Sequence, residues 1–161
     1  TSYESIMKVG IGIDTHKIID GDFLILAGVK IPCDKSILAH SDGDIVYHAI
    51  ADAIYGCLAM GDIGDHFPDS DPSNQGLDSS EIINHAIKSA HASGFEINNI
   101  DIVILLQTPK ISQYKIQMKE NISKLTKCNS ESVNIKASTN ENMGFVGEGK
   151  GISCHALVSI K

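Results

Sequence analysis

Three residues of types that bind metal ions, Asp14, His16 and His48, stand in segments that folding can bring together. The stretch from Lys8 to His16 is apolar and β-branched, so in a strand the side chains of Asp14 and His16 leave the same face. His48 lies in a segment with helical periodicity. Zinc takes such oxygen and nitrogen ligands tetrahedrally, and three protein ligands leave one position open for a substrate oxygen. The alternative is that Asp14 caps a turn and that both histidines are ordinary surface residues.

The segment that carries His48 is expected to form a helix with one buried face. Its apolar residues recur at helical spacing: Ile45, Val46, Ala49, Ile50, Ala53, Ile54, Cys57 and Leu58. On the opposite face Asp44, His48 and Asp52 stand four apart and line up. We expect Ser41 to be the N-cap, with Asp44 in the first turn, and Gly61 to end the helix.

Three further segments are candidate binding sites. Free N–H groups where His40 and Ser41 enter the helix bind anions, although capping by Ser41 explains the same residues. Lys136–Glu141 leaves a strand with two hydroxyls and a carboxylate, which suit a phosphate with Mg²⁺ or Mn²⁺, or are simply a polar strand end. An acidic loop suits ribose hydroxyls or a hard cation, or is merely solvated; it contains Asp62, Asp65, Asp69 and Asp71.

Length and composition predict one compact domain over residues 1–161, with residues 1–7 as a disordered or extended segment. The chain has 161 residues, 42% hydrophobic and 20% charged, which is typical of a globular domain. The net charge of −7 argues against a nucleic-acid partner. No apolar run approaches the roughly 18 residues that would span a membrane. Four cysteines lie far apart without a CxxC motif, so we expect reduced thiols.

The order of the expected elements favours an α/β sandwich, a mixed β-sheet with helices on one face. We expect Lys8–His16 and Phe23–Ile31 to form an antiparallel hairpin. Ile100–Leu106 is a nearly continuous apolar run, which is typical of a strand buried on both faces. The remaining elements are expected to be helices at 78–94 and 112–126 and strands at 132–138 and 152–160.

Five motifs in order along the chain resemble the 2-C-methyl-D-erythritol 2,4-cyclodiphosphate synthase family of the non-mevalonate route to isoprenoid precursors. They are GIDTH, LAHSDGDIVYHAIADAI, GDIGDHFPDSD, LLQTPKI and IKASTNENMGFVGEGKGI. The resemblance runs from Val9 to Ile160. It implies a homotrimer with active sites between neighbouring subunits, and no nucleic-acid or membrane partner.

The resemblance also implies roles for individual residues. Asp14, His16 and His48 match the zinc ligands, and Glu141 matches the ligand of a second divalent cation, Mg²⁺ or Mn²⁺. His40 and Thr139 match catalytic residues that hold the terminal phosphate and steady the transition state. The implied substrate-binding residues are Asp14, His16, His40, Ser41, Asp62, Ile63, Gly64, Phe67, Pro68, Asp69, Ser70, Asp71, Leu106, Gln107, Thr108, Pro109, Lys110, Ile111, Ser112, Ser138, Thr139, Asn140, Glu141, Phe145 and Glu148.

The implied reaction cyclises 4-diphosphocytidyl-2-C-methyl-D-erythritol 2-phosphate to the 2,4-cyclodiphosphate and releases CMP. Because the attacking phosphate is already ionised, no general base is needed, and Asp44 and Asp52 are interpreted as groups that orient the histidine ligands. Glu148 stands where many relatives carry Arg facing the trimer axis. A metal-dependent phosphoesterase and a nucleotide-binding regulatory module are the alternatives.

The expected compartment is a plastid-type organelle, an apicoplast or a chloroplast, because the family occurs there and the chain, rich in Ile and Asn, lacks an initiating Met. The missing Met also suggests a processed or trimmed product. The bacterial cytoplasm is the alternative.

Overall fold

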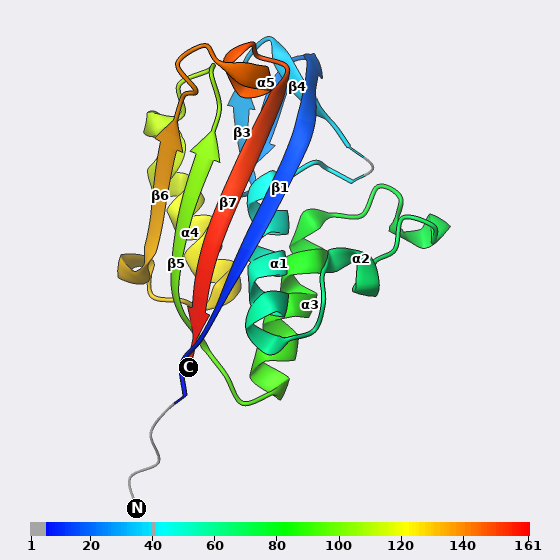
Figure 1. Ribbon diagram of the computed structural model, residues 1–161, viewed down its shortest axis with the longest axis vertical. Helices are drawn as coiled ribbons and strands as arrows, with labels where there is room; N and C mark the ends of the chain where they lie inside the picture. Colours follow the sequence, from blue (N-terminus) through cyan, green and yellow to red (C-terminus); the bar gives the residue numbers. More distant parts are fainter. Residues whose placement is uncertain (1–5, 40) are drawn as a thin grey trace, which may run out of the picture.

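The computed structural model describes residues 6–39 and 41–161, and its core is a five-stranded sheet (Figure 1). The strand order is β4-β1-β7-β5-β6, and only β5 and β6 pair in parallel. The sheet is therefore mixed, and the expected fold class is confirmed. The strands are β1 (Lys8–Asp20), β4 (Lys35–Leu38), β5 (Ile97–Leu105), β6 (Val133–Ser138) and β7 (Gly151–Ile160).

Three helices cover one face of this sheet, behind it in Figure 1. They are α1 (Ile45–Leu58), α3 (Ser79–Ala92) and α4 (Lys115–Thr126). Helix α1 packs on β1 and β7, α4 packs on β6, and α3 packs mainly on α1. Within the described residues, no helix is long and apolar enough to cross a membrane. The shorter elements are α2 (Ile63–His66), α5 (Gly144–Gly147) and 3₁₀ turns at Pro72–Asn74, Ser112–Tyr114 and Ser130–Ser132.

The expected hairpin between Lys8–His16 and Phe23–Ile31 is wrong. Strand β1 pairs with β4 and β7, whereas the second segment folds on itself as β2 (Phe23–Leu26) and β3 (Val29–Pro32). Its two-residue turn consists of Ala27 and Gly28, both with positive φ, which matches the right-handed twist of a tight hairpin. The Asp-Gly-Asp sequence at residues 20–22, a common turn signal, does not join β1 and the second segment in a hairpin.

The cap of α1 also differs from the expectation, because Asp44, and not Ser41, is the N-cap. The Asp44 side chain accepts hydrogen bonds from the N–H groups of Tyr47, Ala27 and Gly28, so it ties the helix to the β2–β3 turn. Burial raises the pKa of Asp44 to about 6, although these three N–H groups favour its charged form. The helix ends with left-handed Ala59 as the C-cap, two residues before Gly61.

The alternation along β5 is another correction. Ile100, Ile102 and Ile104 are buried, while the side chains between them are only half-buried, so the strand is covered on one face and not on both. Helix α3 begins at Ser79 and buries Ile82, Ile83, Ala86, Ile87 and Ala90, in agreement with the expected helix. All four cysteines are free.

Helix α1 lies unusually close to β1 because two glycines face it. A Cβ atom on Gly10 would lie 2.0 Å from the Ala53 carbonyl oxygen, and one on Gly12 would lie 1.9 Å from that of Ala49. No real side chain tolerates such distances, so the helix backbone rests directly on the strand backbone. This approach brings His48, next to Ala49, beside Asp14, which continues the face of Gly12.

We expect Gly12→Ala to destabilise the protein and Gly56→Ala to be tolerated. The new methyl group at position 12 must push α1 away from β1, which costs about 1–3 kcal/mol or more. Gly56 lies in the same interface, but its Cβ would be no closer than 3.6 Å to Gly10, and alanine favours helix by about 1 kcal/mol. Urea unfolding of both variants checks this; equal stabilities would contradict the close-packing argument.

Candidate active site

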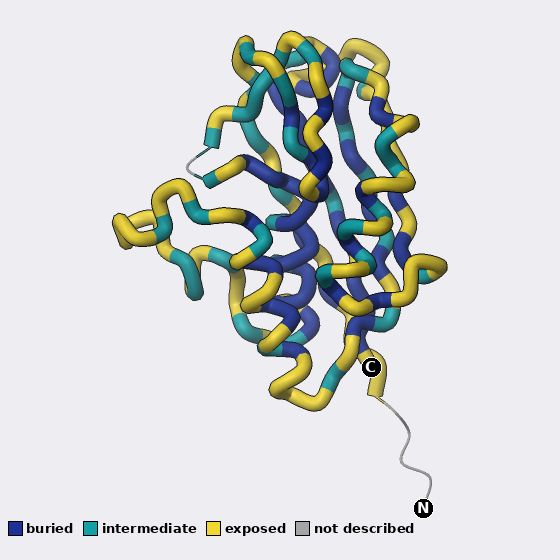
Figure 2. The backbone as a smooth tube through the Cα atoms, turned by 180° about the vertical axis from the view of Figure 1, so that it is seen from behind, coloured by how far each residue is buried: buried dark blue, intermediate teal, exposed yellow. Residues whose placement is uncertain are grey.

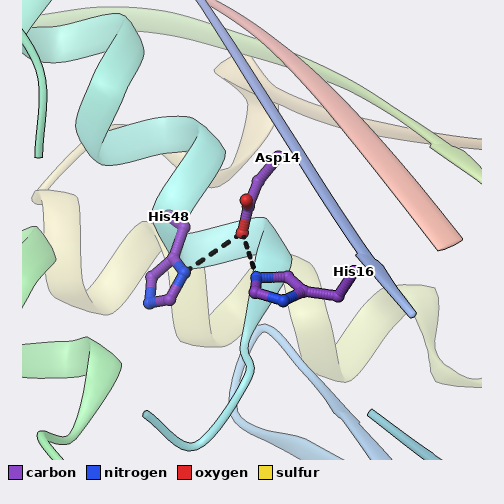
Figure 3. A group of neighbouring side chains, drawn as sticks. All are labelled: Asp14, His16 and His48. Atoms are coloured by element: carbon purple, nitrogen blue, oxygen red, sulfur yellow. Dashed lines mark hydrogen bonds and ion pairs between the residues drawn. The ribbon is translucent and has the colours of Figure 1, made fainter. Parts of the chain in front are cut away.

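Asp14, His16 and His48 converge on one point between β1 and α1 (Figure 3). Their ligand atoms all lie within 4.8 Å of one another. Asp14 Oδ2 is 2.9 Å from His16 Nε2 and 3.1 Å from His48 Nδ1. One carboxylate oxygen and two imidazole nitrogens match the donors of three-ligand metal sites with an open fourth position. The alternative in which these side chains are unrelated surface groups is wrong.

The electrostatics of the trio follow from this convergence. Burial by itself would raise the pKa of Asp14, but the hydrogen bonds and charges of His16 and His48 outweigh it and lower that pKa. The hydrogen bond to Asp14 raises the pKa of His16, against the opposing effect of burial. The carboxylate therefore stays ionised, as a metal ligand must.

The expected row of Asp44, His48 and Asp52 does not act as one unit. Asp44 is buried and bonded to backbone, as described above, and Asp52 Oδ1 accepts a hydrogen bond from Ile63 N–H at 2.8 Å. Neither carboxylate is hydrogen-bonded to His48 in the described residues. The second ring nitrogen of His48 instead contacts Ser79 Oγ at 2.8 Å and Ser41 Oγ at 3.4 Å.

A cavity of about 420 Å³ opens beside the trio. One wall is formed by α2 and the residues that follow it, which belong to an exposed segment that projects from the body of the molecule (Figure 2). The size suits a small ligand with several polar groups. The lining residues are Asp14, His16, Ser41, His48, Asp52, Ile63, Gly64, Phe67, Pro68, Asp69, Asn74, Leu77 and Ile82.

Contacts with α1 and α3 hold this wall in place. Asp52 binds the first turn of α2, and burial raises the pKa of its carboxyl. The Tyr55 ring stacks on His66 with centroids 4.4 Å apart. Burial raises the pKa of the Tyr55 hydroxyl to about 12, and this hydroxyl lies 2.7 Å from His85 Nδ1. His66 Nε2 lies 2.9 Å from the Met60 carbonyl oxygen.

A second polar cluster lies where the parallel strands β5 and β6 end, toward the other edge of the sheet (Figure 1). Gln107 Oε1 accepts hydrogen bonds from the N–H groups of Asn140 and Asn142. Glu141 has a positive φ, and its N–H group contacts Thr139 Oγ1 at 3.4 Å. The side chains of Thr139 and Glu141 are therefore displayed on an exposed turn, separated from β1 by β7 and β5.

Comparison with known proteins decides the family. A model of the YgbB family matches residues 7–161. The chain belongs to this family. The 2-C-methyl-D-erythritol 2,4-cyclodiphosphate synthase of Pelobacter propionicus is 46% identical over 152 residues, which cover 94% of this chain and 96% of the relative. The expected family and enzyme class are confirmed, and the chain is a lyase of the YgbB family.

Solved structures agree with this assignment. IspF of Plasmodium falciparum, in complex with CDP, aligns with a TM-score of 0.85 at 36% identity, covering 99% of this chain and 97% of that one. The bifunctional IspDF of Campylobacter jejuni aligns with a TM-score of 0.92 at 36% identity over 97% of this chain. The chain spans 42% of that longer protein.

The curated relatives do not support the expected plastid-type compartment. Relatives at 43–46% identity come from bacteria, which fits the alternative of a bacterial protein.

The residues expected to serve a YgbB-family site fall into two groups in the structure. Nine of them line the cavity beside the trio or belong to it. Asp62 and Asp71 cap the short helices of the same segment, and Ser70 lies next to Asp71.

The second group of expected residues does not line this cavity. It consists of Leu106–Ser112, Ser138–Glu141, Phe145 and Glu148. Glu148 forms an exposed ion pair with Lys150 at 2.8 Å. His40 lies outside the described residues. The substrate-binding roles remain predictions.

Sequence reasoning missed several residues of the pocket. Asn74, Leu77 and Ile82 line it, and Ser79 contacts His48 although the two are 31 residues apart. Their positions depend on how α3 packs against α1. No spacing pattern in the sequence links these residues to His48. Ser79 in particular looks like an ordinary first residue of a helix.

We expect Asp52→Ala to loosen α2, and Asp52→Asn to preserve it. Alanine leaves Ile63 N–H without its acceptor, whereas the amide oxygen of asparagine can still accept this bond. Amide hydrogen exchange of residues 62–67 should therefore be faster in Asp52→Ala than in the other two proteins. Identical exchange in all three would remove Asp52 from the support of the pocket wall.

Proposed function

We propose that the chain is a zinc-dependent 2-C-methyl-D-erythritol 2,4-cyclodiphosphate synthase. In this reaction an oxygen of the substrate's 2-phosphate forms a bond to the β-phosphorus of the cytidine diphosphate, and the bond from that phosphorus to CMP breaks. The products are the cyclic diphosphate and CMP. The observation that carries the proposal is the convergence of Asp14, His16 and His48 beside a cavity of suitable size in a chain of this family.

The charges in the cavity explain why a cation is needed. Asp14, Asp52 and Asp69 line it, and a phosphate beside these carboxylates would be repelled. A zinc ion held by Asp14, His16 and His48 would neutralise phosphate charge at its open position. The Ser41 hydroxyl, which lines the cavity, supplies a further hydrogen-bond donor. The chain's own contribution is to position the phosphates for the reaction.

The second polar cluster is proposed to bind the rest of the diphosphate and the base. Glu141 would hold a second divalent cation, since Mg²⁺ is commonly bound by one carboxylate together with substrate phosphates. Thr139 would donate its hydroxyl to the transition state, and main-chain groups of Leu106–Ser112 would read cytosine. The CDP bound by the relative from Plasmodium falciparum supports a cytidine nucleotide as the ligand.

A homotrimer is proposed because the two clusters lie apart on one chain. The metal trio is on β1 and α1, while Thr139 and Glu141 follow β6 at the sheet edge. A complete site would then combine the trio of one copy with the second cluster of a neighbouring copy. The outer face of the sheet supports this, because it exposes large apolar residues that single soluble domains usually cover: Val9, Ile11, Ile13 and Leu157.

The deciding experiment supplies the nucleotide substrate to the zinc-loaded protein and identifies the products by ³¹P NMR. We expect the cyclic diphosphate and CMP in equal amounts, and loss of both after chelation or in His48→Ala, because only two ligands then remain. An open-chain phosphate product would favour the phosphoesterase instead. Tight CMP binding with no turnover would favour the regulatory module.

We expect complementation between two inactive variants if each site is shared. His48→Ala removes a metal ligand and Thr139→Ala removes the hydroxyl of the other cluster. When equal amounts of the two variants are mixed at random, about a quarter of the sites would combine an intact metal trio from one subunit with an intact Thr139 from its neighbour. Activity of the co-assembled variants near a quarter of the wild-type value is the expected result. Activity no higher than that of the separate variants would show that one chain supplies the whole site.

A further inference from the structure

His48 has a second hydrogen-bonding nitrogen that the metal does not need. Its Nδ1 points to Asp14, and its Nε2 lies on the other side of the ring, 2.8 Å from Ser79 Oγ. The imidazole is largely enclosed, with 12% of its side chain exposed, and Ser79 is completely buried. A contact this short and this enclosed must satisfy the donor and acceptor pattern of both groups.

The hydroxyl of Ser79 has one proton and two candidate acceptors, His48 Nε2 and Asp42 Oδ1. A carboxylate can only accept, and Ser79 Oγ makes its shorter contact with Asp42. The same carboxylate accepts the N–H groups of Ser79 at 3.0 Å and Asp44 at 3.1 Å, so it is fixed in place. The Ser79 proton therefore goes to Asp42, and a lone pair of Ser79 faces His48.

We propose that Ser79 and Asp42 are positioning residues that hold His48 in the tautomer with its proton on Nε2. In this tautomer Nε2–H donates to Ser79, and Nδ1 offers the metal a lone pair in place of the N–H that otherwise faces the Asp14 carboxylate. The inference rests on the proposed metal-dependent function and extends it to residues outside the trio. Asp44 and Asp52, which the sequence suggested for this task, do not reach His48.

The arrangement also fixes the orientation of the ring. Ser79 is the first residue of α3, Asp42 lies in the turn before α1, and His48 is on α1 itself. The ring of His48 on α1 is thus held by Ser79 at the start of α3, and Ser79 is held by Asp42 in the turn before α1. The Asp42–Ser79 contact therefore joins the starts of both helices. A shift of α3 relative to α1 would move the acceptor of Nε2 and turn Nδ1 away from Asp14.

The test measures zinc affinity by competition with a chromogenic chelator, independently of turnover. We expect Ser79→Ala to weaken zinc binding by about 10- to 100-fold, the usual effect of removing a group that orients a ligand. Ser80→Ala is the matched control, because the Ser80 hydroxyl neighbours Ser79 but has no side-chain hydrogen bond within the described residues; it should stay within about twofold of wild type. Equal zinc affinity in both variants, with native circular dichroism, would overturn the proposal.

A second variant tests whether Asp42 acts on His48 through Ser79, which we call the relay, or only through a general structural effect. In Asp42→Ala the Ser79 proton loses its carboxylate acceptor and turns toward His48 Nε2, which favours the tautomer that blocks Nδ1. Zinc affinity should fall, and the double variant should bind little worse than Ser79→Ala, because both changes act through one contact. Additive losses would overturn the relay. A wild-type protein that binds no zinc would instead overturn the metal-dependent function itself.

Discussion

The backbone contact between α1 and β1 is the constraint on which the rest of the structure depends. Gly10 and Gly12 remove the side chains that would keep the helix at its usual distance, so Ala49 and Ala53 lie directly on the strand. The face of β1 then continues from Gly12 to Asp14 and His16, which are polar because they lie at the first turn of α1, where the cavity begins. A sheet and a helix packed at ordinary distance would not bring His48 within 3.1 Å of Asp14.

The negative charge around the cavity is a second constraint on what this chain can bind. The chain carries a net charge of −7, and carboxylates line the cavity that faces the trio. A phosphate substrate would gain little from such a surface by itself, so under the proposed function its affinity and the lowering of the barrier would depend on cations held locally. Two imidazoles keep Asp14 ionised, and the Asp42–Ser79–His48 contacts extend the same polar chain to the surface.

The metal-ligand trio and the second polar cluster lie at separate places on one chain, and the topology explains why. The strand order places β7 and β5 between the metal trio on β1 and the turn after β6. The same sheet exposes an apolar outer face, in which Ile11 is 64% exposed. Covering that face with further copies would remove the apolar surface from water and bring a metal trio toward a neighbour's Thr139 and Glu141. One assembly step would then stabilise the fold and complete the site.

The sequence by itself determined the ligand types, the strand that aligns Asp14 with His16, the helix of His48 and the mixed sheet, because local periodicity and side-chain chemistry suffice for these. The tertiary structure decided the rest. Strand pairing placed β1 beside β7 and made Phe23–Pro32 a separate hairpin, since partners are chosen by packing across the whole chain. The tertiary structure also made Asp44 the N-cap of α1, because this side chain reaches N–H groups in the distant β2–β3 turn. The packing of α3 against α1 brought Ser79 to His48. Contacts between residues far apart in the chain leave no spacing pattern, and only the packed core defines them.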